Sequence, residues 1–536
     1  MASERPPLAK AYVQAEADVE WLDRSVGAFL REAAQAVPDR LALVVPNIAE
    51  GTARQWTYRE LLADSERVAR ALLQDFAPGD RVATWAGGSA EMALLFLGAS
   101  LAGVVLVTLN PANRAGELEY LLRQGDARGL LLDRTWRGQD NQATIESLRP
   151  KLASLKTLVY FDQWADFLGR AAKDTPLPQV DANGPALIVF TSGTTGKPKG
   201  AVLQHAGIVN NAALAASRIA VPEGSAWLNM LPMFHVGGTV TMTLGTIANR
   251  GTQILLAEFT AEGMLEALQR HQARITMAVP TMLIAMMQSP KFASADLSKL
   301  EVIVTGGTVV APELVREVKS RTSAEVMALM GQTEAGGTMF CTRRGDDVEH
   351  VTQSVGFPLP LSEARIVSAA NETVPTGVVG EICVRTRCRM LEYYGMPEKT
   401  REAVDDEGWL HTGDLGQMRP DGYVQVTGRL KDMIIRGGEN IYPREIEDRL
   451  AEHPAVAQSA VFGLPDPKWG EQVAAAVVLR PSQQATDLQL VEFLQERIAR
   501  HKVPKHWFFV GSLPVNASGK IQKFLLRDQY AAPPPP

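Results

Sequence analysis

From about residue 55 to about residue 310, short apolar runs of strand length alternate with longer amphipathic segments of helical period. RVATWA, GLLLD, ALIVFTS and LEVIVTGG are among the apolar runs, and YRELLADSERVARALLQ is one of the helical segments between them. Strands that alternate with helices form parallel sheets, because each helix carries the chain back to start the next strand in the same direction. The pattern therefore predicts an α/β protein with parallel sheets.

Residues 92–109 form the segment most similar to a membrane span, because these 18 residues carry no charge. The sequence MALLFLGASLAGVVLVTL divides into a helix-like half and a β-branched half that ends at Asn110-Pro111. Buried parallel strands are apolar along their whole length. We therefore predict a buried helix followed by a buried strand, rather than a membrane-spanning helix.

The pattern changes twice further along the chain. Short strands with frequent glycine turns, such as GEICVRT and GYVQVTGR, predict a small β-rich subdomain, and a later mixture of strands and helices predicts a small α+β domain. The terminal AAPPPP has nothing to bury and predicts a disordered tail. The expected organisation is a large N-terminal domain at 1–429 (α/β subdomains to about 354, β-rich subdomain at about 355–429), a hinge at 430–432, a small domain at 433–530 and a tail at 531–536.

Charge and cysteine content exclude several classes of function. A formal net charge of −6 over 536 residues gives no global field that would attract nucleic acid or an anionic membrane. The three cysteines, Cys341, Cys383 and Cys388, form no CxxC pair and predict reduced thiols. The N-terminus is charged and lacks the apolar run of a signal peptide. We expect a cytoplasmic protein without an integral membrane segment, and the sequence leaves a homodimer open.

The segment TSGTTGKPKG at 191–200 has the composition of a phosphate-binding loop and directly follows the apolar run ALIVF. Its glycines let backbone N–H groups turn inward, its hydroxyl groups add donors, and its lysines add positive charge. It is not a Walker A loop, because Pro198 follows Lys197 and Thr191 stands where that motif has its first glycine. A phosphate site is predicted, and a surface loop is the alternative.

This loop is similar to the signature loop of the adenylate-forming (AMP-binding) superfamily, which contains acyl-CoA synthetases, adenylation domains of peptide synthetases, and luciferases. Further motifs of that family follow in its order, so the resemblance covers nearly the whole chain. It implies a small C-terminal domain that is mobile relative to the large one. The motifs are LPMFHVGG (231–238), VTGGTVV (304–310), MGQTE (330–334), GWLHTGDLG (408–416), GRLKDMIIRGGENIYPREIE (428–447) and PVNASGKIQK (514–523).

The resemblance implies ATP, Mg²⁺ and coenzyme A (CoA) as ligands. Glu334 matches the position that holds Mg²⁺, with Thr191 as a further ligand, because a hard cation on phosphates takes oxygen ligands. Asp414 matches the carboxylate that accepts both ribose hydroxyls. The residues implied in ATP binding are Thr191, Ser192, Gly193, Thr194, Thr195, Gly196, Lys199, Gly306, Gly307, Gly331, Gln332, Thr333, Asp414, Arg429 and Lys520.

The catalytic residues implied by the resemblance are Lys520, His235 and Glu334. Lys520 matches the lysine whose ammonium bridges the attacking carboxylate and the α-phosphate. Lys431 matches the hinge about which the small domain turns to a second orientation. Gly437 and Gly438 would then form part of the tunnel for the CoA thiol, although a simple turn before the helix at Pro443 is the alternative.

The acyl pocket is expected beside His235. Its other expected residues are small and uncharged, and none of these stretches offers an aspartate for an amino group, so a non-amino acid is expected. Overall the chain looks most like the medium-chain and general fatty acyl-CoA synthetases. The methionines of VPTMLIAMM could line the pocket or belong to the core. The other expected pocket residues are Val236, Gly237, Thr308, Gly337 and Thr338.

The predicted function is therefore an ATP-dependent carboxylic acid:CoA ligase. It would activate a fatty acid, of medium chain length, as acyl-AMP with release of pyrophosphate, and would then form acyl-CoA. Two alternatives stay open at this point. One is an aryl-acid CoA ligase, and the other is an adenylating enzyme that passes the acyl group to a carrier protein or an amine.

Overall fold

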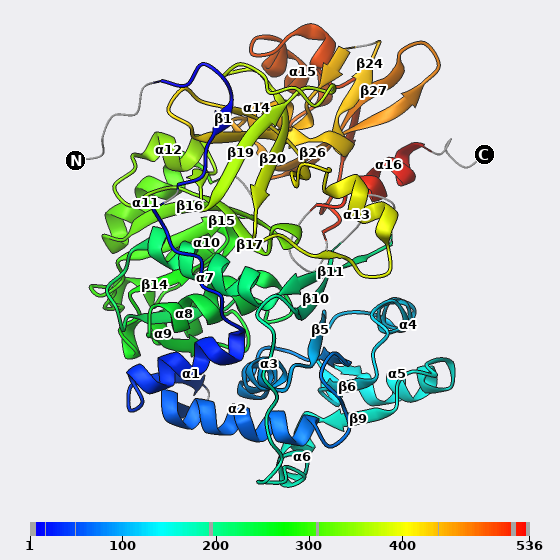
Figure 1. The fold of residues 1–536 in the computed structure, drawn as a ribbon. Coiled ribbons are helices and arrows are strands. Elements are labelled where there is room, and N and C mark those ends of the chain that lie inside the picture. The colour runs from blue at the N-terminus through cyan, green and yellow to red at the C-terminus, as the bar shows by residue number, and fades with distance from the viewer. Residues whose placement is uncertain are drawn as a thin grey trace. The chain divides into compact units, whose positions relative to one another are not determined.

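The computed structural model describes residues 7–16, 18–48, 50–191, 197–306, 310–437, 439–515 and 521–531. The chain divides into two compact units. We call Val13–Ala364 with Cys383–His411 the major unit, and Met1–Tyr12 with Arg365–Ile382 and Thr412–Pro536 the minor unit. Figure 1 shows the elements of both. The three free cysteines are buried.

A seven-stranded sheet lies at one end of the major unit, in the order β21-β11-β10-β5-β4-β6-β9. Its strands from β10 to β9 are parallel, and β11 runs antiparallel to both β10 and β21. The predicted parallel sheet is confirmed, with an antiparallel edge. The strands are β4 (Arg81–Trp85), β5 (Val105–Leu109), β6 (Gly129–Leu132), β9 (Thr157–Tyr160), β10 (Pro185–Thr191), β11 (Lys199–Gln204) and β21 (Glu392–Tyr393).

Helices cover both faces of this sheet. Val82 packs in a core with α1 (Val26–Ala36), α2 (Tyr58–Leu72) and α3 (Ala90–Ala102), whereas its neighbour Ala83 packs on the opposite face with α4 (Ala115–Gln124) and α5 (Asn141–Leu148). Figure 1 shows α1, α2 and α3 side by side. Successive strand residues point to opposite faces, so both faces must be apolar.

The uncharged segment 92–109 comprises most of α3 followed by β5, as predicted. All residues of β5 are buried, and α3 ends at Gly103, whose left-handed φ of +69° suits a glycine. Among the described residues, no helix is both long and apolar enough to cross a membrane.

A nine-stranded sheet forms the rest of the core of the major unit, in the order β18-β17-β16-β15-β14-β12-β13-β2-β3. Its strands from β16 to β2 are parallel, and the edge strands are antiparallel. The strands are β2 (Leu41–Asn47), β3 (Thr52–Thr57), β12 (Ala226–Asn229), β13 (Thr252–Leu255), β14 (Ile275–Met277), β15 (Val302–Gly306), β16 (Glu325–Gln332), β17 (Gly337–Cys341) and β18 (Phe357–Pro358).

One face of the nine-stranded sheet packs against α9, α10 and α11, and the other against α7 and the π-helix η3. Met286 and Met287 of α10 are buried in the core with α9 and α11, so these two methionines of VPTMLIAMM belong to the core. The bounds are α7 (His205–Ile219), η3 (Gly237–Leu244), α8 (Gly245–Ala248), α9 (Ala261–Arg270), α10 (Pro280–Gln288), α11 (Pro312–Thr322), α12 (Val348–Gln353), α6 (Trp164–Gly169) and α13 (Pro397–Ala403).

A five-stranded sheet, in the order β1-β19-β20-β22-β23, contains the glycine-rich strands that the sequence predicts after residue 355. The chain passes from one unit to the other within β1, β19, β20 and β22. The strands are β1 (Tyr12–Val13), β19 (Ser362–Val367), β20 (Gly380–Thr386), β22 (Leu410–Met418) and β23 (Val424–Arg429).

The C-terminal part of the minor unit is a small α+β module. Its long hairpin of β26 and β27 also pairs with β24 and β28, and its two faces pack separate apolar clusters. The predicted fold class is confirmed. The elements are β24 (Ile434–Arg436), β25 (Glu439–Ile441), α14 (Pro443–Ala451), β26 (Val456–Asp466), β27 (Gly470–Leu479), α15 (Asp487–Gln495), β28 (His506–Phe509) and α16 (Lys523–Ala531).

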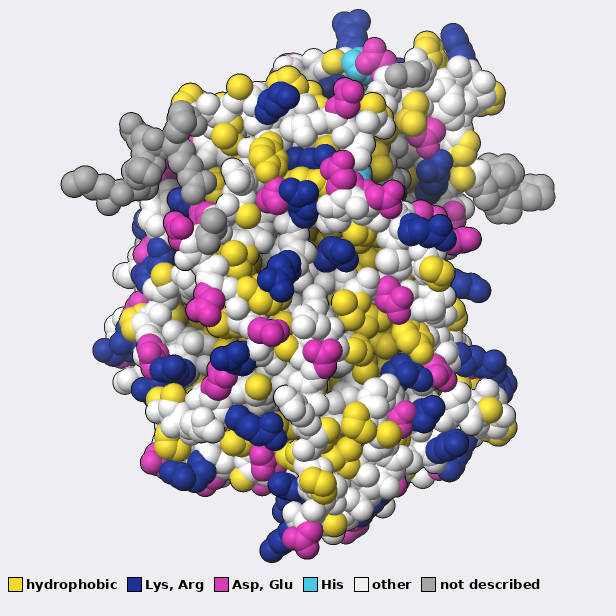
Figure 2. All heavy atoms as spheres, viewed as in Figure 1, with side chains coloured by type: hydrophobic (Ala, Val, Ile, Leu, Met, Phe, Trp, Pro, Cys, Tyr) yellow, Lys and Arg dark blue, Asp and Glu magenta, His cyan; other side chains and the backbone are white. Residues whose placement is uncertain are grey.

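The molecular surface agrees with the small net charge. Figure 2 shows Lys and Arg side chains interspersed with Asp and Glu side chains over the face drawn. No single-sign field covers this face, so an anionic ligand must be recognised by individual side chains.

Candidate active site

Glu334 lies in the short turn η5 (Thr333–Ala335), between β16 and β17 of the major unit, and is only 6% exposed. The Tyr393 hydroxyl donates to its Oε1 at 2.7 Å, and the Thr191 hydroxyl donates to the same oxygen at 3.0 Å. Within the described ranges, its Oε2 accepts no hydrogen bond and contacts no cation. One carboxylate oxygen is thus fixed, and the other is left for a ligand.

The backbone around Glu334 is held equally firmly. Met390 donates its N–H to the carbonyl of Glu334 at 2.8 Å. Gly336 has a left-handed φ of +80°, and a Cβ there would lie 2.2 Å from the carbonyl oxygen of Cys388. Only glycine fits this position. The turn is therefore built around close contact with the segment 388–390.

Tyr393 is a functional candidate that the sequence reasoning missed. Burial, together with the negative charge and hydrogen bond of Glu334, raises the pKa of Tyr393 well above its ordinary value. The phenol therefore stays protonated and donates to the carboxylate. It is the first tyrosine of LEYYGMPEK, and no spacing in that segment points to a partner near residue 334.

The two ends of the expected phosphate loop converge on the same group. Thr191 is the last residue of β10, Lys199 is the first residue of β11, and the two are paired across the strands. The Lys199 ammonium lies 4.1 Å from the centre of the Tyr393 ring. Thr191 therefore binds Glu334 directly, and Lys199 lies beside Tyr393, which also binds Glu334. The expected ATP ligands Ser192, Gly193, Thr194, Thr195 and Gly196 lie outside the described residues.

The remaining expected nucleotide residues of the major unit that the structure describes lie at or just after the ends of neighbouring parallel strands. Gly306 ends β15 opposite Leu329, and a Cβ on Gly306 would lie 2.3 Å from the Leu329 carbonyl oxygen. Gly331 and Gln332 end β16, and Thr333 begins the η5 turn. Ligands of open α/β sheets bind at the carboxyl ends of the strands. Gly307 and Thr308 lie outside the described residues.

The described acyl-pocket candidates lie at the start of the π-helix η3 and on β17. His235 lies two residues before the π-helix η3, and its carbonyl accepts hydrogen bonds from the N–H and the hydroxyl of Thr239. Pi-helices are rare and often mark functional sites. The Thr338 hydroxyl lies 3.5 Å from the hydroxyl of Thr241 in η3. The structure thus brings η3, which begins at Gly237, against β17, which carries Gly337 and Thr338. Val236 directly precedes η3.

Asn211 of α7 is the second residue that the sequence reasoning missed. Its Oδ1 accepts the N–H of Thr338 at 2.9 Å, and its Nδ2 donates to the carbonyl of Thr338 at 2.8 Å. Its neighbour in this contact, Gly337, has a φ of +140°, and a Cβ there would lie 2.5 Å from Asn211 Oδ1. The amide of Asn211 therefore replaces a strand partner for β17.

In the minor unit, Asp414 and Arg429 lie opposite each other on β22 and β23, and their charged groups are 3.3 Å apart. The Asp414 side chain is largely buried, whereas that of Arg429 is 40% exposed. Burial and the nearby Arg429 lower the pKa of Lys431, which lies in the short turn η6 (Leu430–Asp432) after β23. Asp414 and Arg429, the pair implied in ribose binding, thus lie within the single hairpin of β22 and β23.

Gly437 has a φ of +61°, and a Cβ there would lie 2.7 Å from the Trp469 ring. The N–H of Gly437 donates to the carbonyl of Trp469 at 2.7 Å. A side chain at Gly437 is thus excluded by the tryptophan as well as by φ. Gly438 and Lys520 lie outside the described residues.

Comparison with known proteins assigns the chain to a family. The family model described as "AMP-binding enzyme" matches residues 30–394, and that described as "AMP-binding enzyme C-terminal domain" matches residues 445–520. The chain is 35% identical to YngI of Bacillus subtilis (strain 168), covering 95% of this chain and 98% of YngI. It is 33% identical to the mitochondrial medium-chain acyl-CoA ligase ACSF2 of Rattus norvegicus, covering 97% of this chain and 89% of ACSF2.

Its fold is similar to the crystal structure of ATP-bound MatB from Rhodopseudomonas palustris, with a TM-score of 0.86 and 29% identity over 95% of this chain and 99% of MatB. Sequence and structure thus point to the same group of proteins. The chain belongs to the AMP-binding enzyme family, in its acyl-CoA synthetase branch, and is an AMP-forming acid–thiol ligase.

Proposed function

We propose that the protein activates a medium-chain fatty acid with ATP and transfers the acyl group to CoA. In the first half-reaction a carboxylate oxygen attacks the α-phosphorus of ATP, and the bond to the departing pyrophosphate breaks. In the second, the CoA thiolate attacks the acyl carbonyl of the mixed anhydride, and AMP leaves. The medium-chain substrate is supported by the likeness to ACSF2.

The observation that carries the proposal is the arrangement of Glu334, Tyr393 and Thr191. Two hydroxyl donors hold one oxygen of a buried carboxylate, and the ends of a phosphate-type loop lie beside it. Enzymes that cleave phosphoanhydrides gain most of their rate from positioning and from neutralising charge. The hydrogen bonds that hold Glu334 suit this group to positioning the phosphates.

The donor set fits Mg²⁺. Glu334 Oε2 and the Thr191 hydroxyl are hard oxygen donors, and Mg²⁺ on a nucleotide takes only one or two protein ligands and completes its shell with phosphate and water. We assign these two residues as its protein ligands. When bound, the ion would reduce the charge on the ATP phosphates.

The other roles follow from the chain's own residues. Lys199 adds positive charge beside the phosphates, the Asp414 carboxylate accepts the ribose hydroxyls, and Arg429 orients Asp414 through their ion pair. Lys520 stabilises the charge that develops on the α-phosphate. Lys431 serves as the hinge between a large domain (1–429) and a small one (433–530). Gly437 and Gly438 form part of the tunnel through which the CoA thiol reaches the acyl group.

The test uses purified protein with ATP, Mg²⁺ and a panel of straight-chain and aryl acids, with pyrophosphate and thioester measured separately. We expect release of pyrophosphate with saturated acids of medium chain length, and one thioester per pyrophosphate when CoA is present. Preference for an aryl acid would contradict the proposal of a medium-chain fatty acid as the substrate. Pyrophosphate release without thioester would identify an acceptor other than CoA.

A further inference from the structure

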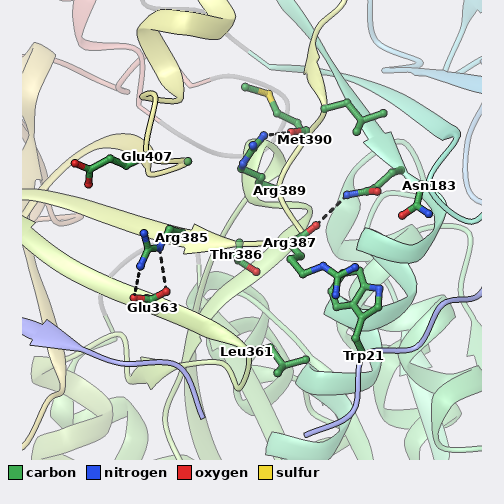
Figure 3. A pocket seen from close by; sticks show the side chains of 13 residues that line it. Trp21, Asn183, Leu361, Glu363, Arg385, Thr386, Arg387, Arg389, Met390 and Glu407 are labelled. Carbon is green, nitrogen blue, oxygen red and sulfur yellow. Dashed lines mark hydrogen bonds and ion pairs between the residues drawn. The ribbon is translucent and has the colours of Figure 1, made fainter. Parts of the chain in front are cut away.

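A cavity of about 500 Å³ lies in the major unit among residues that the adenylation chemistry does not use (Figure 3). Segments far apart in the sequence form its wall: the N-terminal segment, the end of β11, β19, and the stretch from β20 to β21. Ligand pockets commonly have volumes of roughly 300 to 1,000 Å³. The residues that give it its chemistry are Trp21, Gln204, Glu363, Arg385, Arg387, Arg389 and Glu407.

The three arginines differ in their partners. Arg385 is neutralised by Glu363, through hydrogen bonds of 2.9 and 2.8 Å from Nε and Nη2 to the two carboxylate oxygens. Arg387 and Arg389, by contrast, have no carboxylate within 4.0 Å in the part of the chain that the structure describes. Among the described residues, the cavity therefore has two guanidinium groups without a carboxylate partner, and a second carboxylate, that of Glu407, also lines it.

The guanidinium of Arg387 lies over the ring of Trp21, 4.1 Å from its centre, as Figure 3 shows. A guanidinium stacked on an aromatic ring still has its N–H groups at its edge, where they can donate in pairs to an oxyanion. Gln204 Nε2 also donates to the backbone carbonyl of Arg387 at 2.9 Å. Arg387 is thus positioned by contacts that leave its donors available.

Among the described residues, the Arg389 guanidinium makes one hydrogen bond, from Nη1 to the carbonyl of Met390 at 3.0 Å. A guanidinium has five N–H donors, so most of those on Arg389 are available. Met390, which also lines the cavity, is the residue whose N–H donates to the carbonyl of Glu334. The wall of the cavity is therefore joined to the turn that carries Glu334.

We propose that this cavity binds the phosphate group of a small anionic ligand, with Arg387 and Arg389 as its donors. Two guanidinium groups match the charge of a phosphate dianion, and paired N–H donors match its oxygens. The volume exceeds that of one phosphate, which leaves space for a group attached to it. Inorganic phosphate and the phosphate of a nucleotide share this chemistry, and the experiment distinguishes them.

Isothermal titration calorimetry of the full chain tests the proposal, without Mg²⁺, ATP, acid or CoA, so that its outcome is independent of the proposed reaction. One titration uses inorganic phosphate and the other adenosine 3′,5′-bisphosphate. We expect a binding component that weakens at least tenfold in Arg387→Ala and in Arg389→Gln. A component common to all variants arises from binding outside the cavity. Binding of the bisphosphate alone identifies a nucleotide ligand, and binding of both identifies the phosphate group itself.

Two controls separate binding from structure. Arg67→Ala removes an exposed arginine of α2, whose Nε donates to the carbonyl of Leu168, and should leave both isotherms unchanged. In the described part of the chain, Trp21 stacks with Arg387, whereas the Arg389 guanidinium bonds to the Met390 carbonyl, so a loss of binding in Arg389→Gln would not come from release of Trp21. Identical isotherms for the wild type and both cavity variants, or an equal loss in Arg67→Ala, would overturn the proposal.

Discussion

The carboxylate of Glu334 is held by two hydroxyl groups on one oxygen, and this division of its two oxygens defines its expected role. We predict that Glu334→Gln lowers the rate of adenylation at least about 100-fold, roughly 3 kcal/mol, because an amide is a poor ligand for Mg²⁺. The thermal unfolding midpoint should change little, because Tyr393 and Thr191 can donate to the amide oxygen. Tyr393→Phe is the matched control: it keeps the charge, removes one donor, and should cost less activity. Equal activity of Glu334→Gln and the wild type would refute the role.

Asp414 gives a second prediction at this scale. Its partner Arg429 is 40% exposed, and exposed ion pairs contribute only about 0–1 kcal/mol, so Asp414→Asn should scarcely change stability. It should raise KM for ATP by roughly tenfold or more, because an amide accepts fewer hydrogen bonds from the ribose than a carboxylate does. Steady-state kinetics at varied ATP measures this effect. An unchanged KM with a lower unfolding midpoint would make the pair structural.

His205 is the residue that should make stability depend on pH. Burial lowers the pKa of His205 from 6.5 to about 4, because its charged form is costly in the core. Between pH 6.5 and pH 4, His205 therefore binds a proton in the unfolded chain but not in the folded chain. The free energy of unfolding thus decreases as pH falls from 6.5 towards 4. Over that range the loss from this residue is about 3 kcal/mol.

Urea unfolding at about pH 7.5 and about pH 5 checks this loss, which should be near 2 kcal/mol by the lower pH. His205→Gln should have a flatter pH dependence than the wild type. His506→Gln, which removes an exposed histidine, should retain the wild-type dependence. A wild-type slope in His205→Gln would show that other groups control it.

At the scale of elements, the contact between α7 and β17 sets the wall of the expected acyl pocket. Gly337→Ala should destabilise the protein by about 2 kcal/mol or more, because the new methyl group would overlap Asn211 Oδ1 and disturb its hydrogen bonds to Thr338. Gly345→Ala is the matched control, since Gly345 also has a positive φ, of +84°, but has nothing within 4 Å of its Cβ position. It should cost only about 1 kcal/mol. Equal losses would mean that the Asn211 contact contributes nothing.

The elements themselves could mostly be predicted from the sequence, because periodicity and turn residues are local signals. The helix and strand of 92–109 are an example, and so is α2, whose capping box joins Thr57 to Glu60. LQLVEFLQERIARH looks helical throughout from its sequence alone, whereas α15 ends at Gln495. The antiparallel edge strands were not predicted, because pairing with a distant strand has no local signal. Tyr393 and Asn211 escaped prediction for the same reason.

At the scale of the whole molecule, the expected division of work between the two half-reactions rests on Lys520 in the small domain. Lys520→Ala should reduce adenylation at least about 1,000-fold, roughly 4 kcal/mol, because it removes charge aimed at the transition state. Thioester formation from supplied acyl-AMP and CoA should remain within about threefold, because the second half-reaction would use the other orientation of the domain. Stopped-flow or quench assays of each half-reaction measure both. Loss of both half-reactions would argue against two orientations.

The central claim is that an acyl-adenylate forms before the thiol takes part. Acid-dependent exchange of labelled pyrophosphate into ATP, measured with Mg²⁺ and without CoA, tests this claim most directly. The account predicts exchange that requires a medium-chain acid, disappears when the metal is chelated, and is lost in Glu334→Gln. Absence of exchange with every acid, or exchange that begins only when CoA is added, would contradict it.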